Sequence, residues 1–279
     1  MHYHPDKFYR QRDAATRSSA EAICPLVLQW TAAKSVIDVG CGVGTWLDVF
    51  QKLGVGDVFG VEGHWVDKKH LVIPEELFAR ANLEEPFKAA RTFDLAISLE
   101  VAEHLPAQSA GAFVGSLVGL APAVLFSAAI PGQGGTHHVN EQWPEYWARL
   151  FEDCGYAVID CIRREVWQNP RVLWWYAQNT LLFVQKDRVA SYPLLAEAAR
   201  RTARSQLALV HPSHYASKCQ RLAKLEEQAS RLQEELTSVR RTFKALTRNA
   251  AGALGLKAFR ARLRRRTTAT EGDLWTQNR

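Results

Sequence analysis

The fold is decided by a short stretch, SVIDVGCGVGTW, at residues 35–46. An apolar run ending at Val39 leads directly into three glycines, Gly40, Gly42 and Gly44. A buried strand followed by a glycine-rich turn typically brings the backbone close to a nucleotide. The stretch therefore predicts a strand over 36–39 that ends in a nucleotide-binding turn.

Strand and helix patterns alternate along the rest of the chain. The expected helices cover residues 14–31, 46–53, 106–120 and 141–155, and the expected strands cover 36–39, 57–62, 77–83, 93–99, 123–130, 156–161 and 180–185. This alternation predicts an α/β fold with a doubly wound, mostly parallel, seven-stranded sheet of the Rossmann-like type. Ligands of such sheets bind beyond the carboxyl ends of the strands.

Composition restricts the class of protein. The chain has 279 residues, and 47% of them are hydrophobic, which is enough for a substantial core. Its five cysteines are scattered without C-x-x-C spacing, which argues against a disulfide framework or a thiolate zinc site. The first residues are polar, and no apolar run reaches the roughly 18 residues of a membrane span. We therefore expect a cytoplasmic protein.

The net charge of +6 is distributed unevenly. From Lys218 onward there are 15 basic and 6 acidic residues, whereas the preceding part holds 20 and 23. A mildly acidic globular part followed by a basic tail indicates two separate tasks. The predicted organisation is an N-terminal lid or helix over 1–34, a catalytic domain over 35–188, a helical linker over 189–217, a coiled coil over 218–247, a basic amphipathic segment over 248–266 and a disordered tail over 267–279.

The glycine turn narrows the choice of nucleotide. Its pattern is G-x-G-x-G, which differs from the G-x-G-x-x-G of dinucleotide sites, and no G-K-[ST] follows it. Asp38 lies two residues before the first glycine, where a carboxylate would repel a pyrophosphate and suit a cationic ligand. Glu62 ends the second expected strand, where a carboxylate can accept both hydroxyls of a ribose.

These motifs together resemble class I S-adenosylmethionine-dependent methyltransferases. The stretches VIDVGCGVGTW, GVE, ANL and FDLAISLEVAEHLP occur in the order and spacing of that family, within residues 30–186. The resemblance implies S-adenosylmethionine as cofactor. It implies that Gly40, Gly42 and Gly44 admit the methionine part and that Asp38 contacts its ammonium group. It also implies that Glu62 holds the ribose, Asn82 reads the adenine and Leu99 lines the cofactor.

Three polar residues follow the fourth expected strand in the stretch LEVAEHLP: Glu100, Glu103 and His104. If this turn enters a helix, these residues share one face. The next strand's loop supplies His138, so the four residues form a plausible site for Mg²⁺ or Mn²⁺. The pattern is similar to that of ubiquinone-pathway O-methyltransferases and small-RNA 3′-end ribose methyltransferases, in which the trio is linked to a metal. The alternative is a metal-free site in which His104 or His138 is the catalytic base, with Glu103 beside it.

Aromatic residues cluster near the expected active edge. Trp143, Tyr146 and Trp147 begin one helix, and Trp174, Trp175 and Tyr176 precede the last strand. Such rings stack on sugar faces or nucleobases, or belong to the core. The stretch from the N-terminus to WWYAQN also resembles a bacterial methyltransferase subgroup that accompanies polysaccharide-assembly genes.

The tail begins with a strict heptad pattern. Eight residues step by three and four positions in turn: Leu222, Leu225, Ala229, Leu232, Leu236, Val239, Phe243 and Leu246. This spacing predicts a coiled coil and a homo-oligomer, although a single helix packed on the domain gives a similar pattern. Residues 248–266 then hold seven basic and no acidic residues. They suit an anionic membrane surface, nucleic-acid phosphates or solvent.

The sequence thus predicts an S-adenosylmethionine-dependent O-methyltransferase. The expected acceptor is a sugar hydroxyl on a bacterial surface polysaccharide or on a glycosylated metabolite. An RNA ribose methyltransferase is the first alternative, but the acidic globular part makes nucleic acid a poor partner. The others are a natural-product O- or N-methyltransferase and a non-catalytic coiled-coil scaffold.

Overall fold

The computed structural model describes residues 5–253, 255, 258 and 261–262, with side chains from Ala14 to Ala250 and at the last four positions. Its centre is a seven-stranded sheet in the order β3-β2-β1-β4-β5-β7-β6. The strands are β1 (Ser35–Val39), β2 (Asp57–Glu62), β3 (Phe78–Arg80), β4 (Leu95–Leu99), β5 (Ala123–Ser127), β6 (Tyr156–Ile159) and β7 (Leu181–Gln185). Only β7 runs antiparallel to its neighbours, so the predicted mostly parallel, Rossmann-like sheet is confirmed.

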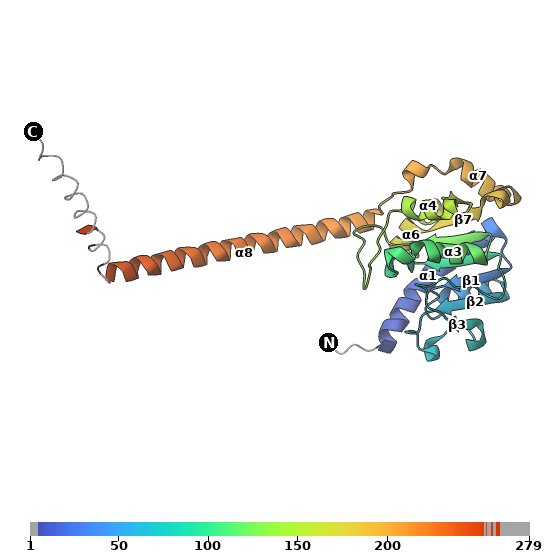
Figure 1. Cartoon of the computed structure of the whole chain (residues 1–279), viewed down its shortest axis with the longest axis horizontal. Helices are drawn as coiled ribbons and strands as arrows, with labels where there is room; N and C mark the ends of the chain where they lie inside the picture. Colours follow the sequence, from blue (N-terminus) through green and yellow to red (C-terminus); the bar gives the residue numbers. More distant parts are fainter. Residues whose placement is uncertain (1–4, 254, 256–257, 259–260, 263–279) are drawn as a thin grey trace, which may run out of the picture. The chain divides into compact units, whose positions relative to one another are not determined.

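Helices connect the strands and cover the sheet (Figure 1). The α-helices of the globular unit are α1 (Pro5–Thr31), α2 (Thr45–Lys52), α3 (Ala110–Leu120), α4 (Pro144–Asp153), α5 (Ile162–Val166), α6 (Trp174–Asn179) and α7 (Pro193–Arg201). The 3₁₀ turns are η1 (Lys68–His70), η2 (Glu75–Leu77), η3 (Ala102–His104), η4 (Ala107–Ser109), η5 (Lys186–Ser191) and η6 (Arg204–Gln206). Each strand and helix expected from the sequence exists, with ends displaced by a few residues.

The core consists of two apolar layers, one on each face of the sheet. Strand β1 contributes to both layers: Val36 packs in one layer, and Ile37 and Val39 pack in the other. Ile23 of α1 and Phe50 of α2 belong to the first layer. Phe113 of α3 and Phe151 of α4 belong to the second layer. Neighbouring strand residues point to opposite faces, so continuous apolar runs are buried on both sides.

The structure departs from the expected elements in three places. Helix α3 begins at Ala110 instead of residue 106, because η4 forms the preceding turn. The strand expected over 123–130 ends at Ser127, where the chain turns into a loop. The helices α5 and α6 were not predicted, because each is shorter than two turns and shows no period in the sequence.

The strand order reverses at β1. From β1 the chain proceeds to β2 and β3 on one side, and β4 and β5 lie on the other side. The loops after β1 and β4 therefore open beside each other at the carboxyl edge of the sheet, which is where ligands of doubly wound folds bind. This edge carries the predicted site residues.

The chain divides into two compact units, Met1–Tyr215 and Ala216–Arg279. Helix α8 (Pro212–Ala253) provides the described part of the second unit. None of the helices in the described residues is long and apolar enough to cross a membrane. The predicted basic segment over 248–266 lies largely outside the described residues, and the tail over 267–279 lies entirely outside them. The predicted lid includes residues 1–4, which are also outside the description.

Candidate active site

The glycine turn after β1 is held in a conformation that favours glycine. Gly40, Gly42 and Gly44 have φ angles of 87°, 55° and 89°. A Cβ on Gly40 would lie 2.3 Å from a side-chain carbon of Val101, which shows how closely the loop after β4 approaches the turn. No heavy atom within the described residues lies within 4 Å of a Cβ placed on Gly42. Gly42 therefore faces open space at the carboxyl edge.

Two carboxylates flank this turn. Asp38 is 2% exposed, and its Oδ2 is buried without a hydrogen-bond partner within the described residues. Burial, with a further contribution from Glu62, raises the pKa of Asp38 well above its usual value. Glu62 Oε2 accepts from Gly42 N at 2.7 Å, and its Oε1 accepts from Gly63 N at 2.8 Å. A carboxylate has further lone pairs, so Glu62 ties the turn to β2 and can still accept from a ligand.

The other two predicted cofactor residues have different surroundings. Leu99 ends β4 and is buried. The side chain of Asn82 is exposed and shapes its own turn, accepting from Glu84 N at 3.1 Å and donating to Glu85 at 3.0 Å. Sequence reasoning missed Trp65, which follows Glu62 closely, is 69% exposed and packs its ring against Gly63. An exposed tryptophan three residues after Glu62 is the signal that was available.

The residues after β4 are not arranged as predicted. Glu100 has a φ of 55°, and η3 covers only three residues, so Glu100, Glu103 and His104 do not share the face of an α-helix. The carboxyl group of Glu100 nevertheless lies beside that of Glu103, and the two groups interact. The prediction of one helical face is therefore wrong.

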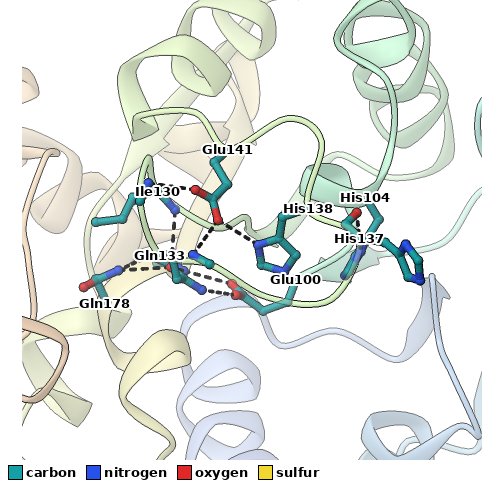
Figure 2. A network of polar contacts seen from close by, with 11 residues as sticks. Glu100, His104, Ile130, Gln133, His137, His138, Glu141 and Gln178 are labelled. Atoms are coloured by element: carbon teal, nitrogen blue, oxygen red, sulfur yellow. Dashed lines mark hydrogen bonds and ion pairs between the residues drawn. The ribbon is translucent and has the colours of Figure 1, made fainter. Parts of the chain in front are cut away.

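Glu100 belongs to a network of amide side chains (Figure 2). It accepts from Gln133 Nε2 at 2.9 Å and from Asn179 Nδ2 at 3.0 Å. Gln178 donates to both Gln133 and Asn179, and its Oε1 accepts from His211 N at 2.9 Å and pairs with His214 Nδ1 at 3.3 Å. The network joins the site to the residues that lead into α8.

Three of the four predicted metal ligands come together. Glu103, His104 and His138 each offer a ligand atom within 4.8 Å of the others, and we call them the Glu103 cluster. The loops after β4 and β5 are tied together here, because Val139 N and Asn140 N both donate to the Glu103 carbonyl. The fourth predicted ligand, Glu100, is outside this cluster, because it is held by the amide network.

Glu103 is fully buried, and its carboxyl group lacks the hydrogen-bond donors that would offset its burial. Within the described residues, no donor makes a hydrogen bond of normal geometry to either of its oxygens. Burial, and then the nearby Glu100, raise the pKa of Glu103 well above its usual value, and N–H groups of Glu103 and Ala129 offset part of the rise. Burial also raises the pKa of Glu100, which the amide donors partly offset. A proton on Glu103 or a bound cation would relieve this pair.

The imidazoles of the cluster are oriented by acceptors. His138 Nδ1 lies 2.9 Å from Glu141 Oε1, and His104 Nδ1 lies 3.3 Å from the His137 carbonyl (Figure 2). Because these partners only accept, Nδ1 carries the hydrogen and the lone pair is on Nε2 in each neutral ring. The two rings meet edge to face, with centroids 4.9 Å apart.

Sequence reasoning missed Glu141, which orients His138. It also accepts from Gly132 N at 2.7 Å and from Gly134 N at 2.6 Å, so it closes the loop after β5. Burial alone would raise its pKa, but the hydrogen bonds from His138, Gly134 and Gly132 lower the pKa of Glu141 below its usual value. The carboxylate is therefore charged near neutral pH and keeps His138 in one tautomer.

Part of the chain matches a known protein family. Residues 11–122 match the family model of a methyltransferase domain. Over these residues the chain matches a methyltransferase domain. The matched residues include the glycine turn, Asp38, Glu62 and the loop after β4, and the prediction of a methyltransferase enzyme is confirmed at this level.

Similar solved structures include proteins named as methyltransferases. DesVI of Streptomyces venezuelae is 27% identical over 47% of this chain, which spans 58% of that protein, with a TM-score of 0.38. An O-methyltransferase family protein of Burkholderia thailandensis is 17% identical over 65% of this chain and 59% of its own, with a TM-score of 0.48. The methyltransferase domain of a bacterial Hen1 is 22% identical over 60% of this chain and 96% of its own, with a TM-score of 0.42. No curated protein sequence matches the chain.

Proposed function

We propose that this chain is an S-adenosylmethionine-dependent O-methyltransferase that acts in the cytoplasm on a sugar hydroxyl of a surface polysaccharide or glycosylated metabolite. The observation that carries the proposal is the Glu103 cluster, which gathers a buried carboxyl and two oriented imidazoles at the carboxyl edge of the sheet. These groups can bind a hydroxyl and remove its proton, which is the chemistry that O-methylation requires.

The glycine turn suits the proposed cofactor. S-adenosylmethionine supplies an electrophilic methyl group on a sulfonium. Asp38 offers a buried, uncompensated oxygen for the ammonium group, and the open space at Gly42 lets the ligand approach the backbone. Glu62, at the end of β2, is placed to accept from ribose hydroxyls.

The Glu103 cluster suits a divalent cation such as Mg²⁺ or Mn²⁺. Its donors are one carboxylate and two imidazoles, and the buried oxygens of Glu103 lack other donors of good geometry in the described part of the chain. When bound there, a cation would lower the pKa of a coordinated hydroxyl. Glu141 would then orient His138 from behind, as acceptors of metal-bound histidines commonly do.

The proton transfer can be assigned to this chain's own groups. The acceptor oxygen forms a bond to the methyl carbon while the bond from that carbon to sulfur breaks. Without a cation, His138 is the favoured proton acceptor, because Glu141 holds its Nδ1–H and leaves the lone pair on Nε2. The negative charge of Glu141 stabilises the imidazolium that forms, which is the role of a carboxylate behind a catalytic histidine.

A cavity near the site supports a sugar acceptor. It has a volume of about 430 Å³ and is lined by Gln142, Trp143, Glu145, Tyr146, Arg149 and Ala208. Trp143 is 42% exposed. It lies three residues after Asn140, whose backbone N–H donates to the Glu103 carbonyl. An exposed ring beside polar and charged side chains is suited to a sugar, which has one apolar face and several hydroxyls.

The other aromatic candidates are engaged in packing. Trp147 and Tyr176 are buried, and Trp174 stacks on His214 with ring centroids 4.7 Å apart. These rings support the core of the globular unit and the start of α8. The expectation of a broad aromatic platform is therefore reduced to Trp143 and Tyr146.

The proposed function is tested by following the methyl group. The purified chain is incubated with methyl-tritiated S-adenosylmethionine and a cell extract, and label is measured in lipid-linked glycan, glycosylated metabolites, RNA and protein. Label in a sugar-containing fraction, lost with Asp38→Ala and retained with the exposed Glu76→Gln control, is the expected result. Label in RNA would overturn the sugar acceptor in favour of ribose methylation. No label in any fraction would favour the scaffold alternative.

Metal use is tested separately. Chelation with EDTA followed by dialysis is expected to abolish turnover, and Mn²⁺ or Mg²⁺ is expected to restore it. Because a cation must displace the proton of Glu103, its binding should release protons and tighten as the pH rises. Calorimetry in buffers of different ionisation enthalpy measures that release. Full turnover after chelation would instead leave His138 as a metal-free base.

A further inference from the structure

Helix α8 carries an apolar seam that is open to solvent. The seam consists of the eight heptad residues Leu222, Leu225, Ala229, Leu232, Leu236, Val239, Phe243 and Leu246. Its seven large side chains are 46% to 67% exposed. Figure 1 draws this part of the chain as one continuous helix. Such a long, continuous apolar surface normally marks an interaction site.

The period of the seam defines the shape of its partner. The seam repeats every 3.5 residues, whereas a straight α-helix repeats every 3.6, so the stripe drifts slowly around the helix. A second helix stays in contact with it only if both helices supercoil, which requires the same repeat on the partner. An α8 helix from another copy of this chain meets that requirement.

We propose that α8 pairs with α8 of a second copy in a parallel, in-register, two-stranded coiled coil. This inference is independent of the acceptor and of the proposed chemistry. Leu222, Ala229, Leu236 and Phe243 take the a positions, and Leu225, Leu232, Val239 and Leu246 take the d positions. Leucine at three of four d positions is typical of two-stranded coils, and two strands are the smallest assembly that covers the seam.

The charges beside the seam determine its orientation. In a parallel pair, each g residue faces the e residue five positions further along the partner. Arg221 then faces Glu226, and Glu235 faces Arg240, so both contacts join opposite charges. The remaining contacts join Gln228 to Gln233 and Thr242 to Thr247, which are neutral. Two-fold symmetry repeats every contact, so the pair gains four ion pairs and no repulsion.

Other arrangements lose these ion pairs. An antiparallel pair that aligns all eight layers faces g with g and e with e, which joins Arg221 to Thr242 and Gln228 to Glu235. Its e contacts join Glu226 to Thr247 and Gln233 to Arg240. Shifting a parallel pair by one heptad brings Arg221 opposite Gln233 and also gives up two apolar layers. Of these three arrangements, only the parallel, in-register pair forms the ion pairs and also keeps every apolar layer.

The first experiment measures the mass of the full chain in solution by light scattering. The expected mass is about 63 kDa, twice the 31.4 kDa of one chain. Leu236→Asp places a charge in a central layer and should reduce the mass to that of one chain. The matched control Ser238→Asp lies on the outer face of the same helix and should leave the dimer intact. A monomeric wild-type chain would overturn the proposal, and a trimer would overturn its two-stranded form.

The second experiment distinguishes the orientations by cross-linking. Leu225→Cys, in a chain whose exposed Cys154 and Cys219 are replaced by serine, brings two thiols together across a d layer of the parallel pair. In the antiparallel pair residue 225 lies opposite residue 243, so the thiols are about 27 Å apart. Oxidation should yield a disulfide-linked dimer, whereas Ser230→Cys on the outer face should not. A dimer by mass that fails to cross-link through residue 225 would overturn the parallel arrangement.

The charge contacts give a further check. Arg221→Glu brings two like charges together in the parallel pair and should raise the dissociation constant about tenfold, for two repelling contacts. Adding Glu226→Arg restores the opposite charges and should restore the affinity. Sedimentation at low salt measures both. If the single and double variants dissociate equally, the proposed contact is absent.

Discussion

Two buried charged groups of the globular unit differ in how completely they are compensated. Arg163 is 1% exposed and forms a two-pronged ion pair with Asp160, at 2.9 and 2.7 Å, while its Nη1 donates to the carbonyls of Leu207 and Gln178. Glu103 is equally buried, but its charged neighbour is Glu100, another acid. The protein supplies hydrogen-bond and ion-pair partners for Arg163, but it does not supply them for the carboxyl oxygens of Glu103.

This difference distinguishes a buried group that stabilises the fold from one that is available to a ligand. A buried charge whose partners are all supplied by the chain stabilises one arrangement and has no capacity for a ligand. A buried carboxyl without adequate donors costs free energy in the isolated protein, and that cost is tolerated where a ligand, cation or reacting group supplies the missing partner. We therefore expect substitutions at the two places to have opposite consequences for stability and activity.

The largest expected effect is on turnover at Glu103. Glu103→Gln removes the carboxylate while keeping its shape, so methyl transfer should fall about 10³-fold, within the range of a lost acid–base or metal-binding group. The same substitution should raise the melting temperature at neutral pH, because a neutral amide can donate to Glu100. Turnover and thermal unfolding of one preparation test both statements. A loss of activity together with a lower melting temperature would contradict the comparison.

The next effect is on stability at Arg163. Arg163→Ala leaves Asp160 without its partner and should reduce the free energy of unfolding by about 3–5 kcal/mol. Replacing both residues by leucine should recover much of that loss, because no unpaired charge is left. Denaturant unfolding measures both variants. Turnover per folded molecule should stay within about threefold of wild type for the double variant, and a larger loss would place this pair in the active site.

A smaller effect is expected at Glu141. Glu141→Gln keeps the size of the side chain but weakens the acceptor that orients His138, so turnover should fall about 10- to 100-fold. The loss should be in kcat, because the orientation of the ring that accepts the proton is affected. A change in KM alone would contradict this prediction and would mean that Glu141 only shapes the loop after β5. Glu145→Gln, in the nearby cavity, is a suitable comparison with an effect expected on KM.

The smallest effect is the pH dependence of stability. Because burial raises the pKa of Glu103 in the folded state, the native protein binds more protons than the unfolded chain between about pH 4.3 and the raised pKa. The contribution of Glu103 to stability is therefore complete below about pH 4.3 and is lost as the pH rises through the raised pKa. Glu103→Gln should be increasingly more stable than wild type as the pH rises. A difference that is constant with pH would contradict the assigned pKa direction.

The strands of the sheet can be predicted from the sequence, because apolar runs mark the segments that are buried on both faces. The strand Val36–Val39 and the following Gly40 are read from local pattern, since a run buried on both faces and a turn with positive φ leave few residue types possible. The ends of strands and the short helices α5 and α6 are less predictable, because contacts from distant segments set them. Ile162 and Tyr176, for example, join the same apolar layer from short segments.

The site is predictable by residue type and less so by arrangement. Glu103, His104 and His138 come together as expected, because the loops after neighbouring parallel strands open at one edge. Glu100 lies beside Glu103 but outside that group of three, because the left-handed turn at Glu100 is a local conformation that the residue type does not indicate. Glu141 and Gln178 were missed, because an orienting residue has no motif of its own.

The single side chain of Gln178 has a consequence for how the site is built into the globular unit. One end of its amide is bound to the donors of Glu100, and the other end is bound to the backbone and ring of residues that lead into α8. Any displacement at the start of that helix must either break these bonds or move the amide. The donors that hold the Glu100 carboxyl group are therefore fixed in place by residues more than thirty positions further along the chain.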